Sequence, residues 1–407
     1  MEVEPVSFIK LEDAGITAAK GYRAAGLHCG IKFKRPDLGL LVSDTPAQAA
    51  GVFTTNQVKA ACVEVNQQLL SERRKVRALV VNSGNANACN GPQGLDDTHE
   101  MQSITGRRLG IEPHEVLVAS TGVIGVPLPM SKIQQGIERA CRELDTTGAH
   151  AFSEAILTTD LVTKECAVQL QLDGCTITIG GVAKGSGMIH PNMATMLAFL
   201  ATDASVEDGV LQPLIQDIVD RTFNMISVDG DTSTNDMVLV LANGQADNPP
   251  LAPGRPGWQE FYQAVHFVSL ELAKMIARDG EGATKLIQVT VSGAVDEAAA
   301  RLAARTVTRS PLVKTAVYGA DANWGRILCA VGYSGITFDP SKTKISLGPI
   351  EVYRGRGLEF DESAARDYLL QDTIEIHIDL QSGQAAATAY GCDLTEDYIK
   401  INASYRS

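Results

Sequence analysis

Apolar and polar residues alternate from Cys166 to Ile179, and Asp173-Gly174 interrupts the alternation. An Asp-Gly pair between two alternating runs is a strong local signal for a β-hairpin, and alternation means that each strand buries one face. The same pattern returns between Ile374 and Leu380. Because half-buried strands are typical of antiparallel or mixed sheets, the chain is expected to build such sheets and not a fully parallel one.

Helical periodicity separates these strands. Apolar residues recur at steps of three and four over residues 131–144, 210–223 and 258–277, which predicts three amphipathic helices. Short apolar runs at 75–81 and 116–119 end in turn residues and read as buried strands. Strands and helices do not alternate regularly, so we predict an α+β fold in which mixed or antiparallel sheets are layered with helices. The clearest linker candidate is the Pro- and Gly-rich stretch 243–257.

Charge and cysteine usage narrow the function classes. The formal net charge of −13 over 407 residues gives no general attraction for nucleic acid or for an anionic membrane. The eight cysteines form no Cys-x-x-Cys pair and no zinc-finger spacing, so we expect reduced cysteines and no metal site. The acidic first 15 residues do not resemble a signal peptide, and no apolar run is long enough to span a bilayer. We therefore expect a cytoplasmic protein without nucleic-acid or membrane partners.

Small and polar residues gather in six loops. Standard nucleotide-binding and hydrolase fingerprints are missing from the sequence. Glycine-rich loops let the backbone approach a ligand closely and offer N–H donors to it. One such loop alone is best explained as a tight turn, but six together favour a polar ligand site built from several of them. The loops are residues 82–91, 120–125, 180–187, 229–236, 279–283 and 318–325.

Thr195 stands where the third of these loops gives way to the apolar run 196–201. Taken alone, it reads as a threonine at the edge of a strand. The chemical alternative is a nucleophile, because an N-terminal threonine carries its own base, the α-amine, which titrates at about 7.7–8.0. A mid-chain threonine gains that amine only if the peptide bond before it is cut. Its hydroxyl can make this cut by attacking the Ala194 carbonyl, provided that donors stabilise the oxyanion.

The segment 184–197, KGSGMIHPNMATML, resembles the self-cleavage segment of the ornithine acetyltransferase family, many of whose members are also glutamate N-acetyltransferases of arginine synthesis. The resemblance extends over essentially the whole chain. Its other motifs are residues 82–90, 120–122, 158–160, 229–236, 279–282 and 319–326, followed by Asn402 and the C-terminal Tyr-Arg-Ser. It implies a self-cleaving enzyme with an N-terminal nucleophile.

The family's site residues carry over position by position. The resemblance implies cleavage between Ala194 and Thr195, which gives an α chain of residues 1–194 and a β chain of residues 195–407. These chains are expected to stay together, usually as an α2β2 heterotetramer. Thr195 matches the nucleophile that carries the acetyl group. The matched oxyanion-hole pair is Thr121 and Gly122, and the matched substrate-binding positions are Thr158, Lys184, Thr195, Glu281, Asn402 and Ser407.

Two of these matches carry a qualification. Thr159 is an alternative to its neighbour Thr158 as the substrate contact. Family members commonly end in Thr, whereas this chain ends in Ser407, which keeps the hydroxyl. The residue types also suit the substrates, because Lys184 can hold an α-carboxylate and Glu281 an ammonium.

The implied reaction is a ping-pong acetyl transfer from N-acetylornithine to glutamate through acetyl-Thr195, with no bound cofactor. A bifunctional member would also acetylate glutamate from acetyl-CoA, and we predict this bifunctional form. A monofunctional ornithine acetyltransferase is the alternative. A self-cleaving aminopeptidase of related fold and a non-enzymatic binding protein are the rival classes.

Overall fold

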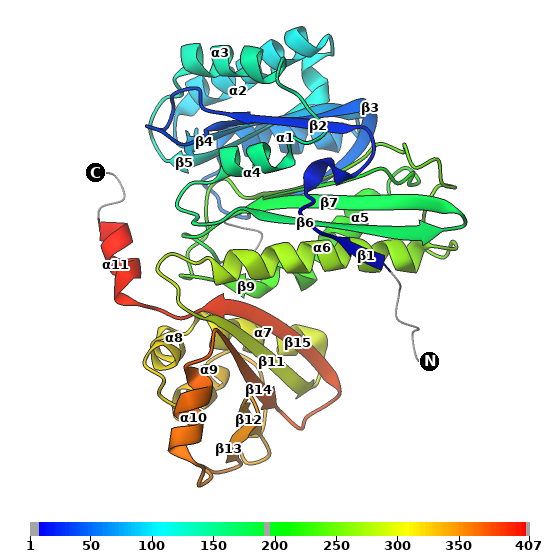
Figure 1. The fold of residues 1–407 in the computed structure, drawn as a ribbon. Helices are drawn as coiled ribbons and strands as arrows, with labels where there is room; N and C mark the ends of the chain where they lie inside the picture. Colours follow the sequence, from blue (N-terminus) through cyan, green and yellow to red (C-terminus); the bar gives the residue numbers. More distant parts are fainter. Residues whose placement is uncertain (1–7, 191–195, 404–407) are drawn as a thin grey trace. The chain divides into compact units, whose positions relative to one another are not determined.

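The computed structural model describes residues 8–190 and 196–403, and the chain forms two compact units (Figure 1). Unit 1 comprises Met1–Gly185, Asn192–Asn224 and Thr232–Ala273, and unit 2 comprises Ser186–Pro191, Met225–Asp231 and Lys274–Ser407. The chain thus passes from unit 1 to unit 2 within the glycine-rich loop 180–187. No helix in the described part of the chain is long and apolar enough to cross a membrane.

Unit 1 is built on a mixed sheet, in which the described residues supply nine strands. Eight of them follow the order β1-β6-β7-β8-β10-β3-β4-β5, and β2 pairs with β3 off this path. The strands are β1 (Phe8–Leu11), β2 (Tyr22–Leu27), β3 (Leu38–Phe53), β4 (Val76–Asn85), β5 (Val116–Val123), β6 (Lys164–Leu172), β7 (Cys175–Lys184), β8 (Leu197–Thr202) and β10 (Met237–Ala242).

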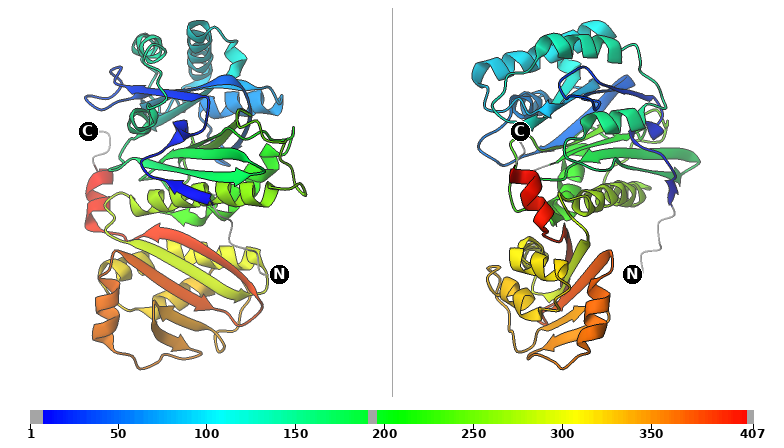
Figure 2. Two further views of the ribbon diagram at one scale, coloured as in Figure 1. Left: turned by 45° about the vertical axis from the view of Figure 1, so that its right-hand side comes forward. Right: turned by 60° about the vertical axis from the view of Figure 1, so that its left-hand side comes forward.

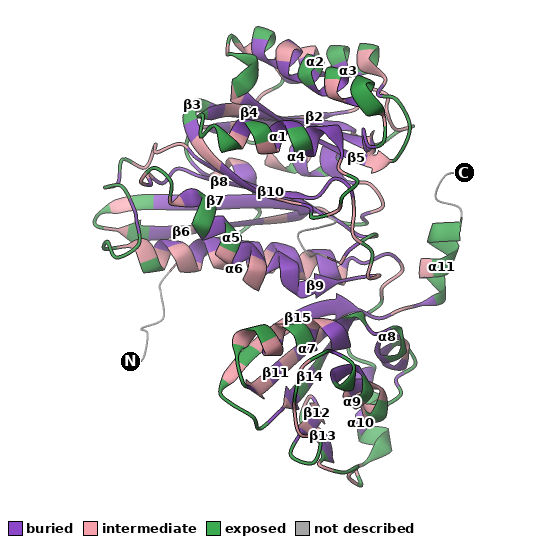
Figure 3. Cartoon of the chain, turned by 180° about the vertical axis from the view of Figure 1, so that it is seen from behind, coloured by how far each residue is buried: buried purple, intermediate pink, exposed green. Residues whose placement is uncertain are grey.

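The predicted hairpin is confirmed as β6 and β7, which pair antiparallel around Asp173 and Gly174. Both turn residues have positive φ, as the Asp-Gly signal requires. The apolar run after Thr195 becomes β8, which pairs antiparallel with β7 and parallel with β10. All residues of β8 and β10 are buried, and Figure 3 shows both strands inside the unit. A continuous apolar run therefore marks a central strand here.

Six helices cover this sheet: α1 (Ala61–Ser71), α2 (Gly91–Leu109), α3 (Met130–Ala140), α4 (Ala149–Ile156), α5 (Leu211–Arg221) and α6 (Trp258–Arg278), the last of which continues into unit 2. α2 and α3 pack together over β2 to β5, whereas α4 packs between that part of the sheet and β6–β7 (Figure 2). α6 runs along the hairpin strands (Figure 1). The three helices predicted from periodicity are confirmed as α3, α5 and α6.

Unit 2 contains a second mixed sheet, with six strands among the described residues in the order β13-β12-β14-β11-β15-β9. They are β9 (Ile226–Ser227), β11 (Leu286–Ala294), β12 (Lys344–Leu347), β13 (Ile350–Arg354), β14 (Thr373–Asp379) and β15 (Ala385–Cys392). Its helices are α7 (Glu297–Arg309), α8 (Pro311–Tyr318), α9 (Trp324–Gly332), α10 (Glu362–Leu369) and α11 (Glu396–Ala403). The predicted strand 374–380 is confirmed as β14.

The α+β prediction is thus confirmed, with mixed sheets and packed helices in each unit. The Pro- and Gly-rich stretch 243–257 connects β10 to α6 inside unit 1, so it does not separate compact units. It is held by local bonds such as Leu251 N–H to Ser205 O, 3.0 Å. All eight cysteines are unpaired thiols.

Candidate active site

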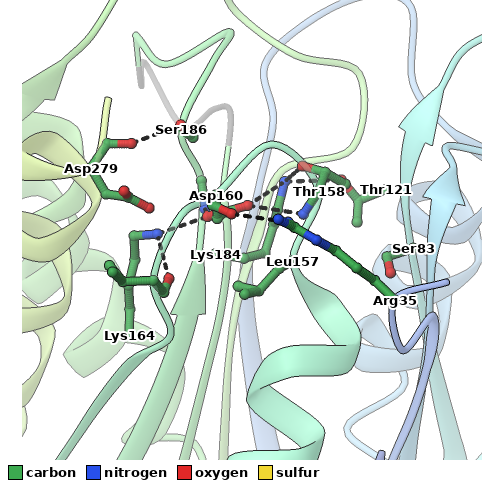
Figure 4. Close-up of polar contacts among 12 residues, drawn as sticks. Arg35, Ser83, Thr121, Leu157, Thr158, Asp160, Lys164, Lys184, Ser186 and Asp279 are labelled. Atoms are coloured by element: carbon green, nitrogen blue, oxygen red, sulfur yellow. Dashed lines mark hydrogen bonds and ion pairs between the residues drawn. The ribbon is translucent and has the colours of Figure 1, made fainter. Parts of the chain in front are cut away.

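Lys184, the last residue of β7, has a buried side chain that meets two predicted site residues (Figure 4). Its Nζ donates to Thr158 Oγ1 at 2.8 Å and to Thr121 Oγ1 at 3.3 Å. The structure therefore brings a predicted substrate-binding pair and a predicted oxyanion-hole residue together in unit 1. Of the two neighbouring threonines, Thr158 is the one whose hydroxyl meets Lys184.

Asp160 contacts both Thr158 and Lys184, although the sequence analysis gave it no role. Its fully buried carboxylate accepts hydrogen bonds from Lys164 Nζ at 2.8 Å and from Gly185 N–H at 2.6 Å, and its Oδ2 lies 4.0 Å from Lys184 Nζ. It also accepts from the N–H of Thr158 at 3.0 Å. Burial alone would raise the pKa of Asp160, but the Lys184 and Lys164 ammonium groups hold it well below its usual range.

Lys164 is as deeply buried as Asp160 and was likewise not predicted. Two buried ammonium groups thus share the carboxylate of Asp160. The sequence signal that could have found the pair is the spacing Asp160-x-x-x-Lys164 beside the Thr-Thr-Asp motif. That spacing is common on surfaces, and only the fold makes it a buried pair.

Thr121 and Gly122 lie near the end of β5, beside the end of β4. Gly122 has φ +136°, and a Cβ there would come within 2.3 Å of the Gly84 carbonyl carbon, so only glycine fits. Because Lys184 donates to Thr121 Oγ1, the Thr121 O–H proton points elsewhere and is available to an oxyanion. An oxyanion hole needs donors of this kind, and the resemblance assigns that role to Thr121 and Gly122.

The first small-residue loop, 82–91, fixes these strand ends. Ser120 Oγ donates to Asn82 Oδ1 at 2.7 Å, and Asn82 Nδ2 donates to Asn85 O at 2.8 Å. Asn235, from the loop 229–236, donates to Ser120 O at 2.8 Å and to Ala86 O at 2.6 Å. Two of the six loops thus hold Ser120, the residue before Thr121, through buried amides.

Lys32 adds a further cation to this part of unit 1. Its Nζ donates to Leu157 O at 2.7 Å, next to Thr158. Burial lowers its pKa to about 8; Asp37 opposes this shift, and Lys184 and Arg35 add to it. Buried Asp37 shapes the loop by accepting the N–H groups of residues 29–32. Positive charge is therefore concentrated around Thr158 in a chain that is acidic as a whole.

Unit 2 holds the predicted acidic residue. Glu281 is buried, and its Oε2 accepts a hydrogen bond from Asn402 Nδ2 on α11 at 2.7 Å. Its backbone N–H donates to Ser186 O at 3.1 Å, and Ser186 Oγ donates to Asp279 O at 2.7 Å. A Cβ at Gly187 would lie 2.4 Å from the Glu281 carboxylate, so this glycine makes room for the acid. Glu281 and Asn402, both predicted as substrate-binding positions, thus contact each other in unit 2.

The remaining predicted residues, Ala194, Thr195 and Ser407, lie outside the described residues. The candidate residues therefore form two separate groups: Thr121, Gly122, Thr158 and Lys184 in unit 1, and Glu281 and Asn402 in unit 2. The first group offers donors and positive charge, which suit a carboxylate and an oxyanion. The second offers a carboxylate, which suits an amine.

Comparison with known proteins gives one consistent family. Residues 23–407 match the family model described as the ArgJ family. A relative from Oceanobacillus iheyensis, named "Arginine biosynthesis bifunctional protein ArgJ", is 52% identical over 411 residues and covers all of both chains. A relative of the same name from Symbiobacterium thermophilum is 52% identical over 397 residues, covering 97% of this chain and 98% of its own.

A solved structure of "Arginine biosynthesis bifunctional protein argJ" from Bacillus halodurans is 50% identical, with a TM-score of 0.51. That solved chain is matched over its whole length, yet it covers only 52% of this chain. The resemblance drawn from the motifs is therefore confirmed at the level of the whole sequence and by a solved fold.

Proposed function

Because the chain belongs to the ArgJ family, it is an acetyltransferase of arginine biosynthesis, and we propose that the Thr195 hydroxyl is its acetyl carrier. The single observation that carries this proposal is the position of Lys184, whose ammonium meets both Thr158 and Thr121. A substrate carboxylate bound there would place the substrate next to the oxyanion donors of Thr121 and Gly122.

Self-cleavage supplies the nucleophile in this mechanism. The Thr195 oxygen adds to the Ala194 carbonyl carbon, the C–N bond breaks, and the hydroxyl proton ends on the released nitrogen. Water then hydrolyses the resulting ester, which frees the Ala194 carboxylate and restores the Thr195 hydroxyl. The half-length solved chain supports this step, because the stretch from Thr195 to the end is likewise about half of this chain.

The topology of unit 1 supports the continued association of the two products. β8 and β10 follow Thr195 in the sequence, and they pair with β7 and β3, which precede it. The central strands of one sheet would thus come from one product and its flanking strands from the other. Separating the products would break the ladders from β7 to β8 and from β10 to β3. We propose that two such pairs form the α2β2 heterotetramer and that the enzyme is cytoplasmic.

Acetyl transfer follows from the same groups. The free α-amine of Thr195 takes the hydroxyl proton as the oxygen attacks the acetyl carbonyl of N-acetylornithine. Thr121 O–H and Gly122 N–H stabilise the oxyanion, and the α-ammonium returns its proton to the ornithine nitrogen as the C–N bond breaks. Glutamate then attacks the acetyl ester in the reverse sense. Lys184 holds the α-carboxylate of each substrate, and Glu281, oriented by Asn402, holds an ammonium.

The bifunctional form is supported by relatives that match nearly the whole chain at 52% identity and are named bifunctional. We propose that the second activity uses acetyl-CoA to acetylate Thr195 in place of N-acetylornithine. No cofactor stays bound in this scheme. An assay of glutamate acetylation with acetyl-CoA alone decides between the bifunctional and the monofunctional form.

The deciding experiment is intact mass and N-terminal sequencing of the wild type, Thr195→Ala and Thr195→Ser, followed by acetyl-transfer assays. We expect the wild type to give two fragments, one beginning with Thr195-Met196-Leu197. Thr195→Ala should stay whole and inactive, and Thr195→Ser should still be cut. Thr337→Ala, which changes an exposed threonine outside the candidate groups, is the control. Turnover by Thr195→Ala at the wild-type rate would end the proposal, and rapid hydrolysis of peptide amides would favour the aminopeptidase.

A further inference from the structure

The motif 229–236 has a second task in the structure, at its first residue. The carboxylate of Asp229 accepts hydrogen bonds from the backbone N–H of Met188, at 2.6 Å to Oδ2, and of Ile189, at 2.8 Å to Oδ1. All three residues belong to unit 2. The two oxygens of one side chain thus hold two consecutive peptide groups just ahead of the proposed cleavage point.

Further bonds join the same two backbone segments. Val228 N–H donates to Ile189 O at 2.6 Å, and His190 Nδ1 lies 3.1 Å from Ser227 Oγ. Ile189 is fully buried. Residues 188–190 are therefore fixed by side-chain and backbone contacts to the strand end 227–229, and not by packing alone.

The conformation held in this way is a costly one. Met188 has φ +57°, in the left-handed region that residues with a Cβ seldom adopt. Such a conformation persists where surrounding contacts determine it, and the two N–H bonds to Asp229 are those contacts. Tyr398, on α11, also donates to Asp229 Oδ2 at 3.3 Å and helps to fix the carboxylate.

We propose that Asp229 is a positioning residue for self-cleavage: it sets the backbone direction of residues 188–190 from which the chain enters the scissile bond. This role rests on the proposed function. From Ile189 only five residues remain before Thr195, so fixing residues 188 and 189 removes much of the freedom of the attacking geometry. In this scheme Asp229 acts through the backbone of residues 188–190.

The test follows uncut chain by intact mass after synthesis, in the wild type and in Asp229→Ala, Asp229→Asn and Tyr398→Phe. We expect Asp229→Ala to slow cleavage about 10- to 100-fold, since misplacement of this kind carries that cost. Asp229→Asn should fall in between, because its amide keeps one acceptor oxygen. Tyr398→Phe should have the smallest effect.

Asp393→Asn is the matched control. Asp393 is a carboxylate of unit 2 that also accepts two consecutive backbone N–H groups, those of Thr284 at 2.8 Å and Lys285 at 2.9 Å. Its loss should lower the melting temperature as much as Asp229→Asn does, yet leave the cleavage rate unchanged. Equal slowing in both variants would reduce Asp229 to a structural role and overturn the proposal.

Hydroxylamine separates positioning of the attack from later steps, because it cuts an ester at once and leaves an amide intact. We expect hydroxylamine not to speed the cleavage of Asp229→Ala, since the slowed step is the formation of the ester. Rapid rescue, or cleavage of Asp229→Ala at the wild-type rate, would overturn the positioning role while self-cleavage stands. An uncut wild-type chain would instead overturn the self-cleavage mechanism itself, and this role of Asp229 with it.

Discussion

Each compact unit holds one group of candidate residues, and the two groups differ in charge and in how their side chains are fixed. In unit 1, Lys184 shares the buried carboxylate of Asp160 with buried Lys164, so its position is part of the core. In unit 2, the carboxylate of Glu281 is oriented by Asn402, an exposed residue of α11. The Lys184 ammonium is thus fixed by a buried charge whose removal would lower the free energy of unfolding. The Glu281 carboxylate is oriented by an amide near the surface.

This difference has a physical reason. A buried ammonium must be paired, because burying an unpaired charge costs far more than burying an unpaired amide. Unit 1 satisfies this rule with Asp160, and we expect the free energy of unfolding to fall when Asp160 or one of its lysine partners is changed. Unit 2 has no such constraint at Asn402, so changes there should affect substrate binding before they affect folding.

The largest expected effect is on the unit 1 side. Asp160→Asn removes the buried carboxylate that Lys164 and Lys184 share, and we expect a loss of about 3–5 kcal/mol in the free energy of unfolding. Urea or thermal denaturation measures it. Glu138→Gln is the control, because it removes an exposed pair with Arg108 and should change stability little. Similar losses in both variants would contradict the distinction between buried and exposed pairs.

A smaller effect is expected from Lys184→Met, which removes the ammonium but keeps an apolar side chain of similar length. The variant should fold, while kcat/KM for N-acetylornithine and for glutamate should both fall about 10- to 100-fold, the worth of one charged hydrogen bond. Steady-state kinetics measures this, with exposed Lys342→Met as the control. A loss confined to one of the two substrates would contradict the assignment of Lys184 to their common carboxylate.

Glu281→Gln should act on the unit 2 side alone. The amide can still pair with Asn402 but carries no charge for an ammonium, so KM should rise about tenfold with the melting temperature nearly unchanged. Binding of ornithine, followed by calorimetry, and the melting curve together check this. A melting temperature lowered as far as in Asp160→Asn would show that Glu281 contributes to folding as much as the buried pair of unit 1 does.

The smallest effect is a contrast in pH dependence between Asp160 and Asp229. The pKa of Asp160 is lowered, so its stabilisation is complete above the unfolded value near 4 and is lost as the pH falls toward the folded value. The pKa of Asp229 is raised, mainly by burial, so its contribution is greatest at low pH and is lost as the pH rises through the folded value. Relative to wild type, melting temperatures between pH 5 and 3 should fall less steeply in Asp160→Asn and more steeply in Asp229→Asn. Equal slopes in both variants would contradict the opposite shifts.

The sequence predicts elements whose pattern is local. The hairpin around Asp173-Gly174 and the helix at 258–277 follow from alternation and from apolar steps of three and four, and both are confirmed. β3 has no such signal. Its 16 residues include Pro46 and Gly51 and a shift of register between Val42 and Ala47, so the alternation on which a prediction depends is interrupted.

The candidate residues also divide into those that a sequence motif predicts and those that only the fold shows. Thr121, Thr158, Lys184, Glu281 and Asn402 were found because whole motifs match a family, and the structure brings them together within their units. Asp160, Lys164 and Asp229 act through burial and through contacts with backbone far along the chain. Such contacts depend on packing between distant segments, which no local pattern encodes.

Strands from both sides of Thr195 pair with one another in unit 1, so the proposed cleavage should follow folding. Cleavage before folding would leave one fragment without β8 and β10 and expose the facing edges of β7 and β3, which have unpaired N–H and C=O groups. Open apolar edges of this kind recruit other strands and aggregate. A nucleophile that becomes competent only when the finished fold holds its backbone would avoid this outcome, so the proposed self-cleavage would also serve as a check that assembly has been completed.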